Sequence, residues 1–307
     1  MSPRELRSGA LAALRVADPV AKVSAVHALA RSAPSPDPAL ELEAPADIPG
    51  RPTRPALVRP AELARRPAGT PEGRAALLHA LAHIEFNAIN LALDAVWRFG
   101  DMPEAYYRDW MRVADEEATH FSLLCERLAA LGAAYGDFPA HDGLWEMAER
   151  TAADVLARMA LVPRTLEARG LDASPAIRAK LAAAGDEASA RVIDVILRDE
   201  IGHVAIGNRW FRFLCTLRGL DVRQAYADLS ALHRAPRLRG PFNLPARRAA
   251  GFDEDELRAL RPQLTGSGAL NSSGALALMI TAITTRCRKT ESAGMTRMEL
   301  AGTPLIL

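Results

Sequence analysis

The 307-residue chain contains few cysteines and few aromatic residues. Its three cysteines, Cys125, Cys215 and Cys287, show no Cys-x-x-Cys spacing, so we expect neither a disulfide framework nor a structural zinc site. Aromatic residues make up 5% of the chain, whereas alanine and leucine are abundant. A β-sheet protein would need more valine, isoleucine, tyrosine and phenylalanine, so this composition favours packed helices.

The chain also lacks an excess of either charge and lacks long hydrophobic runs. Its 38 Lys+Arg residues balance 37 Asp+Glu residues, which gives a formal net charge of +1 and excludes nucleic-acid binding through bulk positive charge. The longest apolar stretch near the C-terminus, Ala275 to Ile283, is too short to span a membrane, and the N-terminal segment lacks the apolar centre of a signal peptide. We therefore expect a cytoplasmic protein with no membrane partner and no nucleic-acid partner.

The residue pattern divides the chain into five parts. Eight prolines between residues 34 and 60 fix φ and remove backbone donors, so this segment is expected to be extended rather than helical. Residues 261–307 have low charge, no helical period and many Ser, Thr and Gly; they fit either a flexible native tail or a non-native extension, and we expect no function from them. The expected parts are an N-terminal helix (1–31) with a break at Asp18-Pro19, a proline-rich strap or linker (32–70), a four-helix bundle (71–220), a post-bundle helical segment (221–260) and the tail (261–307).

Capping and helix-breaking residues delimit the helices of the 71–220 part. Pro163 predicts a kink in the third helix, Gly170 its end, and Ser174-Pro175 the start of the next helix, which Gly185-Asp186 interrupts. Long amphipathic helices joined by short loops are typical of an antiparallel four-helix bundle, so we expect an all-α fold. The expected helices span about 71–99, 103–131, 142–169 and 174–218.

Two of these helices contain the sequence Glu-x-x-His. Glu117 precedes His120 in the second helix, and Glu200 precedes His203 in the last one. Three residues rotate a helix by about 300°, so each Glu and His lie one turn apart on the same face and can reach one metal ion. One such pair on a helix surface is usually a solvated polar pair. Two pairs, each inside an apolar helical stretch, favour a metal site.

A dinuclear site in a helical bundle needs one further glutamate from each of the other two helices. Glu85 is the only acid in the first helix between Glu72 and Asp94, and it lies 32 residues before Glu117. The third helix offers Glu167, which lies 33 residues before Glu200, and Glu149, which lies 51 residues before it. Similar spacings place residues at similar depth in two antiparallel helix pairs, so we predict Glu167 as the ligand and keep Glu149 as a rival.

The order Glu, Glu-x-x-His, Glu, Glu-x-x-His resembles that of the ferritin-like superfamily of dinuclear carboxylate proteins. Within that superfamily, three stretches look like an uncharacterised bacterial ferritin-like family known as a domain of unknown function, and the resemblance covers about Leu77 to Leu260. A weaker resemblance connects the chain to tRNA-modifying di-iron hydroxylases. The three stretches are DWMRVADEEATHFSLLCERLAALGAAYGDFPAHDGLWE, MALVPRTLEARGLD and ILRDEIGHVAIGNRWF.

The resemblance implies two metal ions per chain and a role for each ligand. Glu117 and Glu200 would bridge the ions, Glu85 and Glu167 would be terminal ligands, and His120 and His203 would each supply one nitrogen. Carboxylates and imidazoles suit iron most, with manganese or a mixed Mn/Fe pair as alternatives. Candidates for positioning the ligands are Glu116, Asp199, His83 and Arg164. His79 and His83 are spaced like a metal pair, but His83 lies about 200° from Glu85 around the helix, which favours a structural or supporting role.

The expected function is that of an O₂-dependent oxidase or hydroxylase acting on a small or nucleotide-like substrate, with a separate reductase supplying electrons. A hydrolase that acts on phosphoesters through a metal-bound hydroxide is an alternative, and a metal-binding or iron-handling protein without catalysis is a second one. A homodimer is also compatible with the sequence. Mixed Glu/His ligation on a bundle favours oxidoreductase chemistry by analogy with the superfamily.

Overall fold

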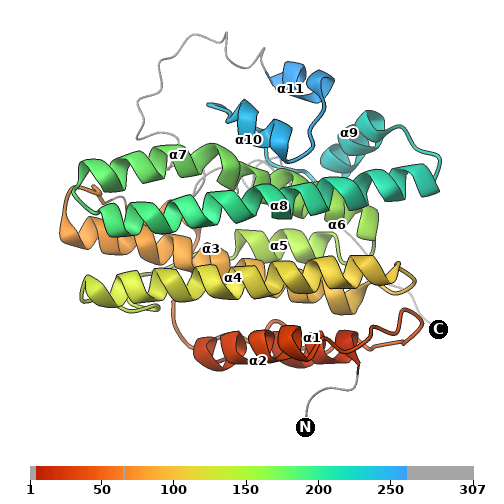
Figure 1. Cartoon of the computed structure of the whole chain (residues 1–307), viewed down its shortest axis with the longest axis horizontal. Coiled ribbons are helices and arrows are strands. Elements are labelled where there is room, and N and C mark those ends of the chain that lie inside the picture. The colour runs from red at the N-terminus through yellow and green to blue at the C-terminus, as the bar shows by residue number, and fades with distance from the viewer. Residues whose placement is uncertain (1–4, 65, 261–307) are drawn as a thin grey trace, which may run out of the picture.

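A computed structural model describes residues 5–64 and 66–260, and this part of the chain is helical without any β-strand. An isolated bridge between Leu57 and Ala140 is the only β-type pairing among these residues. The predicted all-α class is therefore confirmed (Figure 1). The helices are α1 (Leu6–Leu14), α2 (Pro19–Ser32), η1 (Pro60–Glu62), α3 (Pro71–Arg98), α4 (Glu104–Ala130), α5 (Gly143–Arg150), α6 (Val155–Leu161), η2 (Val162–Glu167), α7 (Ala168–Ala183), α8 (Glu187–Leu217), α9 (Val222–Leu232), α10 (Leu244–Ala249) and α11 (Glu254–Leu260).

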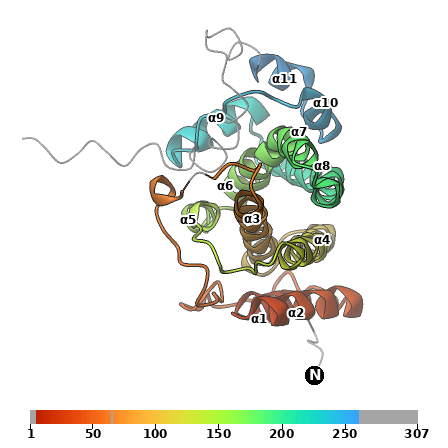
Figure 2. The ribbon, with the colours of Figure 1, turned by 90° about the vertical axis from the view of Figure 1, so that its left-hand side faces the viewer.

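Helices α3, α4, α7 and α8 run along the long axis of the molecule and are seen end-on in Figure 2. Local sequence sets where they begin and end. Thr70 accepts a hydrogen bond from the Gly73 N–H at 3.1 Å before α3, and Asp186 accepts one from the Ser189 N–H at 3.0 Å before α8. Gly132 adopts φ of 75° directly after α4, a conformation that suits glycine.

The third long segment differs from the sequence expectation. It consists of α6, the π-helical turn η2 and α7, and it continues through Gly170 and Ser174-Pro175, where a break was expected. Pro175 cannot donate to the carbonyl of Leu171, but the side-chain amide of Asn243 donates to that carbonyl at 3.1 Å. A partner distant in the sequence thus replaces the missing hydrogen bond and keeps α7 intact. The expected start at Asp142 instead opens a separate short helix, α5.

The N-terminal part is broken at Asp18-Pro19, as predicted, because the Asp18 carboxylate accepts the Ala21 N–H and caps a new helix, α2. Helices α1 and α2 pack on α3 and α4 through buried polar groups. Arg7 donates to the Trp97 carbonyl at 2.9 Å, and Lys22 donates to the Asn90 side chain. These contacts fix the N-terminal helices to the long ones.

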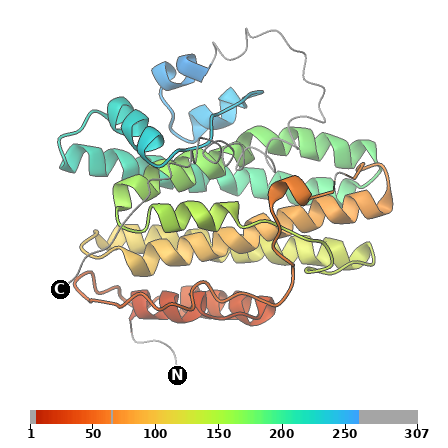
Figure 3. The same ribbon diagram turned by 180° about the vertical axis from the view of Figure 1, so that it is seen from behind.

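The proline-rich strap, residues 33–70, connects α2 to α3, and the short helix η1 is the only helix among its described residues. It passes along the same side of α3 as α5, as the end-on and rear views show (Figures 2 and 3). Arg51 pairs with Asp142 at 2.5 Å, and the Val58 N–H donates to the Ala140 carbonyl at 2.8 Å. The strap is thereby attached to the loop that precedes α5.

After α8 the chain forms the short helices α9, α10 and α11. Helices α10 and α11 lie over α7 and α8 (Figure 1), where Phe252 and Leu257 form a small core with Leu171 and Val204. Buried Arg247 pairs with Asp172 on α7 at 2.6 Å. The expected tail, 261–307, lies outside the described residues.

Helix α3 is long and apolar enough to cross a membrane by length and composition alone. However, 83% of its most apolar window is buried inside the fold, which is typical of a core helix. Helix α3 thus packs among other helices, and Glu85 near its centre is buried in the interior.

Candidate metal centre

Both Glu-x-x-His pairs point into the interior between the long helices. Glu117 and His120 come from α4, and Glu200 and His203 come from α8. The exposed fractions are 0% for Glu117, 1% for His120, 7% for Glu200 and 0% for His203. Burial of four ionisable side chains is costly unless they are paired or bind a metal ion. This burial excludes the interpretation as solvated surface pairs.

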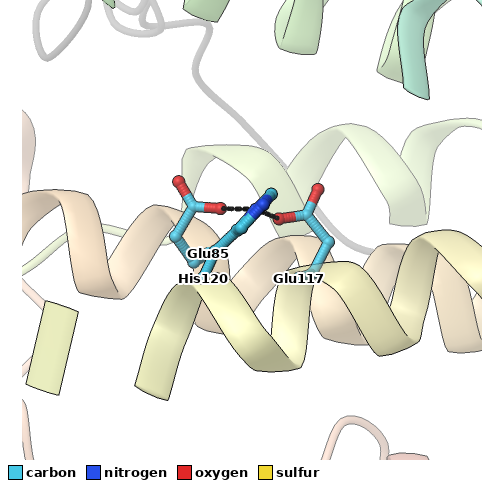
Figure 4. A group of neighbouring side chains, drawn as sticks. All are labelled: Glu85, Glu117 and His120. Atoms are coloured by element: carbon cyan, nitrogen blue, oxygen red, sulfur yellow. Dashed lines mark hydrogen bonds and ion pairs between the residues drawn. The ribbon is translucent and has the colours of Figure 1, made fainter. Parts of the chain in front are cut away.

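The first cluster joins α3 to α4. His120 Nδ1 lies 3.2 Å from Glu117 Oε2 and 3.4 Å from Glu85 Oε2. Figure 4 shows the imidazole between the two carboxylates, one from each helix. One ligand atom from each of the three side chains falls within 4.8 Å of the other two, so they could hold one metal ion.

The second cluster joins α4 to α8 and shares Glu117 with the first. His203 Nδ1 lies 3.0 Å from Glu117 Oε1, and Glu200 offers a carboxylate oxygen within 4.8 Å of both groups. The two oxygens of Glu117 therefore face different histidines. A carboxylate in this position can bridge two ions.

Two buried carboxylate oxygens at or beside the clusters have no hydrogen-bond partner, Glu200 Oε2 and Glu167 Oε2. Buried polar atoms nearly always have a partner, and an unpaired one costs about 1–3 kcal/mol. Both oxygens can act as ligand atoms, so their position fits a bound cation.

The outward nitrogens of both histidines are held by carboxylates. His120 Nε2 lies 3.1 Å from Asp199 Oδ2, and His203 Nε2 lies 2.7 Å from Glu116 Oε2. A proton on Nε2 can be donated to these carboxylates, which leaves the Nδ1 lone pair directed to the interior. Asp199 and Glu116, both predicted from sequence as supporting residues, thus contact the histidines in the manner typical of metal sites.

Without metal, the glutamates and histidines of the site have pKa values that are shifted in different directions. Burial, together with the charge of Glu117, raises the pKa of Glu85 and of Glu167 to about 8 and raises that of Glu200 well above its usual range. Burial also acts to raise the pKa of Glu117, but His203 and His120 outweigh it and hold this pKa well below its usual range. The carboxylates raise the pKa of His120 to about 12 against the effect of burial. One ionised glutamate between two imidazolium groups therefore describes the site without metal.

Glu167 lies at the end of the π-helical turn η2, and its charge interacts with Glu117 and His203. Its ligand atoms fall outside the two close clusters, although it lines the same pocket as Glu85 and Glu200. The rival Glu149 lies on α5, where its carboxylate accepts a hydrogen bond from Trp145 Nε1 at 3.0 Å. The structure thus brings Glu167, rather than Glu149, to the other glutamates.

Two predicted supporting residues lie elsewhere. His83 Nδ1 lies 2.9 Å from the Tyr135 hydroxyl, and its Nε2 lies 3.1 Å from the His141 carbonyl, so its partners are not the cluster residues. Arg164 donates to Asn208 and Glu256 and anchors η2 to α8 and α11. Both residues were predicted because they lie near a proposed metal ligand in the sequence. Their hydrogen bonds go to residues outside the clusters.

A pocket of about 1020 Å³ adjoins the clusters. Glu85, Glu167 and Glu200 form part of its wall, and most of the remaining wall is apolar. The strap contributes Pro60 and Leu63 to the lining. The sequence could not place the strap on this pocket, because irregular segments carry no periodic signal that predicts which face they cover.

The sequence matches the family described as protein of unknown function DUF455 over residues 15–258. The chain belongs to this family. An uncharacterized protein of Haemophilus influenzae (strain ATCC 51907 / DSM 11121 / KW20 / Rd) is 53% identical over 213 residues, which cover 67% of this chain and 74% of that protein. No solved structure matches the chain.

The DUF455 match includes both clusters, the carboxylates that hold the histidines and the strap. It also includes α9, α10 and most of α11. The family description names no activity.

Proposed function

We propose that this DUF455 protein is a ferritin-like dinuclear metal enzyme, an O₂-dependent oxidase or hydroxylase of a small organic substrate. The observation that supports this most directly is the position of Glu117, whose two oxygens lie near His120 and His203 respectively. Glu85, Glu117 and His120 would hold one ion, and Glu117, Glu200 and His203 the other, with Glu167 as a further ligand. The four long helical segments would form the corresponding four-helix bundle.

A bound pair of iron or manganese ions supplies redox chemistry toward dioxygen. The overall reaction of a hydroxylase balances as RH + O₂ + 2e⁻ + 2H⁺ → ROH + H₂O, with the electrons provided by a separate reductase. The chain's own side chains do the rest. Asp199 and Glu116 orient the imidazoles, and the apolar pocket wall excludes water from the side where Glu85, Glu167 and Glu200 lie.

The pocket favours this proposal over a phosphoester hydrolase. A phosphoester is strongly hydrated and negatively charged, whereas most of the pocket wall is aliphatic and contains the carboxylates of Glu85, Glu167 and Glu200. Arg66, Arg169 and Lys180 also line the pocket, but Arg66 is already paired with Glu72. An apolar organic molecule fits such a wall better. A protein that only handles iron would not need an enclosed apolar pocket of this size.

Metal content tests the proposal first. The chain, reconstituted with Fe(II) under anaerobic conditions and desalted, is expected to retain about two ions when measured by inductively coupled plasma mass spectrometry. Glu117→Ala should lose both ions because Glu117 belongs to both clusters. Glu149→Ala removes an acid on α5 outside the clusters and should retain the metal.

Oxygen uptake by the loaded protein is the second readout. Consumption of O₂ with an optical change on oxidation supports an oxidase. Metal retention without O₂ uptake, combined with turnover of p-nitrophenyl phosphate in the presence of Mn(II) or Zn(II), would instead establish the hydrolase. Metal retention with neither reaction would indicate iron handling. Absence of bound metal in the wild type would refute all three.

A further inference from the structure

The pocket beside the glutamates is elongated. Along α7 its wall runs from Glu167 to Lys180, a separation of 13 residues that corresponds to about 20 Å at the rise of an α-helix. Along α3 the wall runs from Gly73 past Glu85 to Leu91. The glutamates therefore lie part-way along the pocket, with lining residues on both sides of them.

Three helices line the pocket with aliphatic side chains at helical spacing. Leu77, Ile84 and Leu91 recur every seventh residue of α3, and Ile177 and Ile193 come from α7 and α8. Residues at this spacing share one helix face, so α3 presents a continuous apolar stripe to the pocket. The strap contributes Pro60, Leu63 and Ala64 to the lining, and Figure 2 shows that it runs on the same side of α3 as α5. A long channel with apolar walls fits an extended hydrocarbon better than a compact polar molecule.

Positive side chains line the channel at two places. Arg169 lies two residues after Glu167 and interacts with Asp172, so nearby carboxylates offset its charge. Lys180 lies 13 residues from Glu167 along α7, and Arg66 lines the channel beside the first turn of α3, where it contacts Glu72. Lys180 is half-buried, and burial lowers its pKa. Arg66 lies over the Phe138 ring, with 5.3 Å between its guanidinium carbon and the ring centroid, and pairs with Glu72 at 3.0 Å. A cation at the end of an apolar channel can pair with one anionic group of a ligand.

We propose that the channel binds an elongated, mainly apolar molecule with a single anionic group, which lies at the Lys180 end while the hydrocarbon body extends alongside Glu85 and Glu167. This assigns the substrate class of the proposed enzyme and rests on that function only for the reaction at the metal. Binding itself depends on the aliphatic residues of the channel wall and on Lys180, none of which belongs to the clusters.

Decanoate is a suitable probe, and 1-decanol is its uncharged counterpart. Isothermal titration of the full chain should show about one decanoate bound with micromolar affinity, and weaker binding of decanol. Lys180→Gln should weaken decanoate binding about tenfold and leave decanol binding unchanged. The matched control is Arg178→Gln, which removes a positive charge from α7 at a side chain outside the channel that pairs with Asp194 and Glu187. This control should leave both affinities as in the wild type.

A second variant tests the location. Ala80 lines the channel on α3, so Ala80→Phe should obstruct it and reduce the affinity for both probes, with circular dichroism verifying the helical content. Absence of decanoate binding to the wild type, equal effects of the Lys180 and Arg178 variants, or unchanged binding to Ala80→Phe would each overturn the proposal.

The titrations are made with both metal-loaded and metal-free wild type, which separates this proposal from the one above. Decanoate binding by a chain that fails to retain metal would refute the dinuclear enzyme and leave the channel assignment standing. Metal retention without decanoate binding would refute the channel assignment alone.

Discussion

Gly207 on α8 lies directly against Pro163 in the π-helical turn η2. A Cβ atom added to Gly207 would stand 2.4 Å from Pro163 Cβ and 2.6 Å from Pro163 Cγ, far inside van der Waals contact. Only glycine allows α8 to approach η2 this closely. Because η2 ends at Glu167, this contact also sets the position of that carboxylate.

Gly207→Ala is therefore expected to destabilise the fold by about 1–3 kcal/mol, the usual range for overpacking in a core. It should also reduce metal retention, because separation of α8 from η2 moves Glu167. Urea unfolding and metal analysis measure the two effects. Gly202→Ala is the matched control on the same helix: its Cβ would meet nothing within 4 Å, so a gain of about 0.5–1 kcal/mol is expected. Equal behaviour of the two variants would disprove the role of the Gly207 contact.

Asp199 and Glu116 accept hydrogen bonds from the outward nitrogens of the two histidines. Asp199→Asn and Glu116→Gln keep the size of each side chain but weaken the acceptor for the Nε2–H of His120 or His203. Each variant should lower the metal affinity about 10–100-fold while the helical content stays unchanged. Competition with a chromogenic chelator measures this affinity. Glu126→Gln, an exposed acid on the same helix as Glu116, should bind metal like the wild type; a similar loss in this control would indicate a general charge effect.

Asp94, which follows Glu85 by nine residues on α3, is the centre of a buried ion-pair network. It accepts hydrogen bonds from Arg158, from Arg98 at 2.7 Å and from Trp97 Nε1 at 3.1 Å. The arginines hold the pKa of Asp94 below its usual range although burial acts in the opposite direction. Asp94→Asn would leave the Arg158 charge buried and should cost about 3–5 kcal/mol in urea unfolding.

The control for this variant is Glu104→Gln, which breaks an exposed pair with Arg108 at 2.9 Å and should change stability by less than about 1 kcal/mol. Since the pKa of Asp94 is lower in the folded state, its contribution is present above the unfolded pKa near 3.8 and disappears as the pH falls through the folded value. The wild type should therefore approach the stability of Asp94→Asn in strong acid. A constant difference at every pH would contradict the network.

His83 predicts a further pH dependence. Burial lowers its pKa from 6.5 to about 3. Below pH 6.5 the unfolded chain takes up a proton that folded His83 does not, so stability falls as the pH drops from 6.5 toward 3. A variant with His83→Leu should lose its hydrogen bond to Tyr135 at neutral pH but lack this slope. From pH 7 to pH 5 the wild type should lose about 1–2 kcal/mol more than the variant.

The difference between the two proteins isolates His83, since the other titrating groups are common to both. Urea unfolding of metal-free protein at several pH values provides the measurement. Parallel curves for wild type and variant would show that His83 is protonated in the folded state.

Helical spacing accounts for the part of the site that sequence could predict. The interval of three residues placed Glu117 with His120 and Glu200 with His203 on single helix faces, as found in the structure. The similar intervals from Glu85 to Glu117 and from Glu167 to Glu200 depend only on helix length and tight turns, so they favoured Glu167 over Glu149. Because a helix has a fixed repeat, the spacing of its residues in the sequence predicts which of them share a face and a depth.

Contacts between distant segments account for what sequence did not predict. Pro175 was expected to begin a helix, but Asn243 supplies the hydrogen bond that the Leu171 carbonyl would otherwise lose. In η2, the Thr165 hydroxyl donates a hydrogen bond to the Ala160 carbonyl at 2.8 Å, so this carbonyl has a partner in the distorted turn. Local propensity argues for a break at each position, and only the folded arrangement shows the compensating partner.

The two histidines are held from one side of the site, and the channel adjoins it from another. Glu116 and Asp199, between α4 and α8, are partly exposed, whereas the channel lies among α3, α7, α8 and the strap. The carboxylates that contact the histidines and the channel therefore lie on different sides of the same glutamates. Variation of the channel wall could alter which molecule is accepted without disturbing the carboxylates that tune the imidazoles, so selectivity and reactivity of this centre can evolve independently.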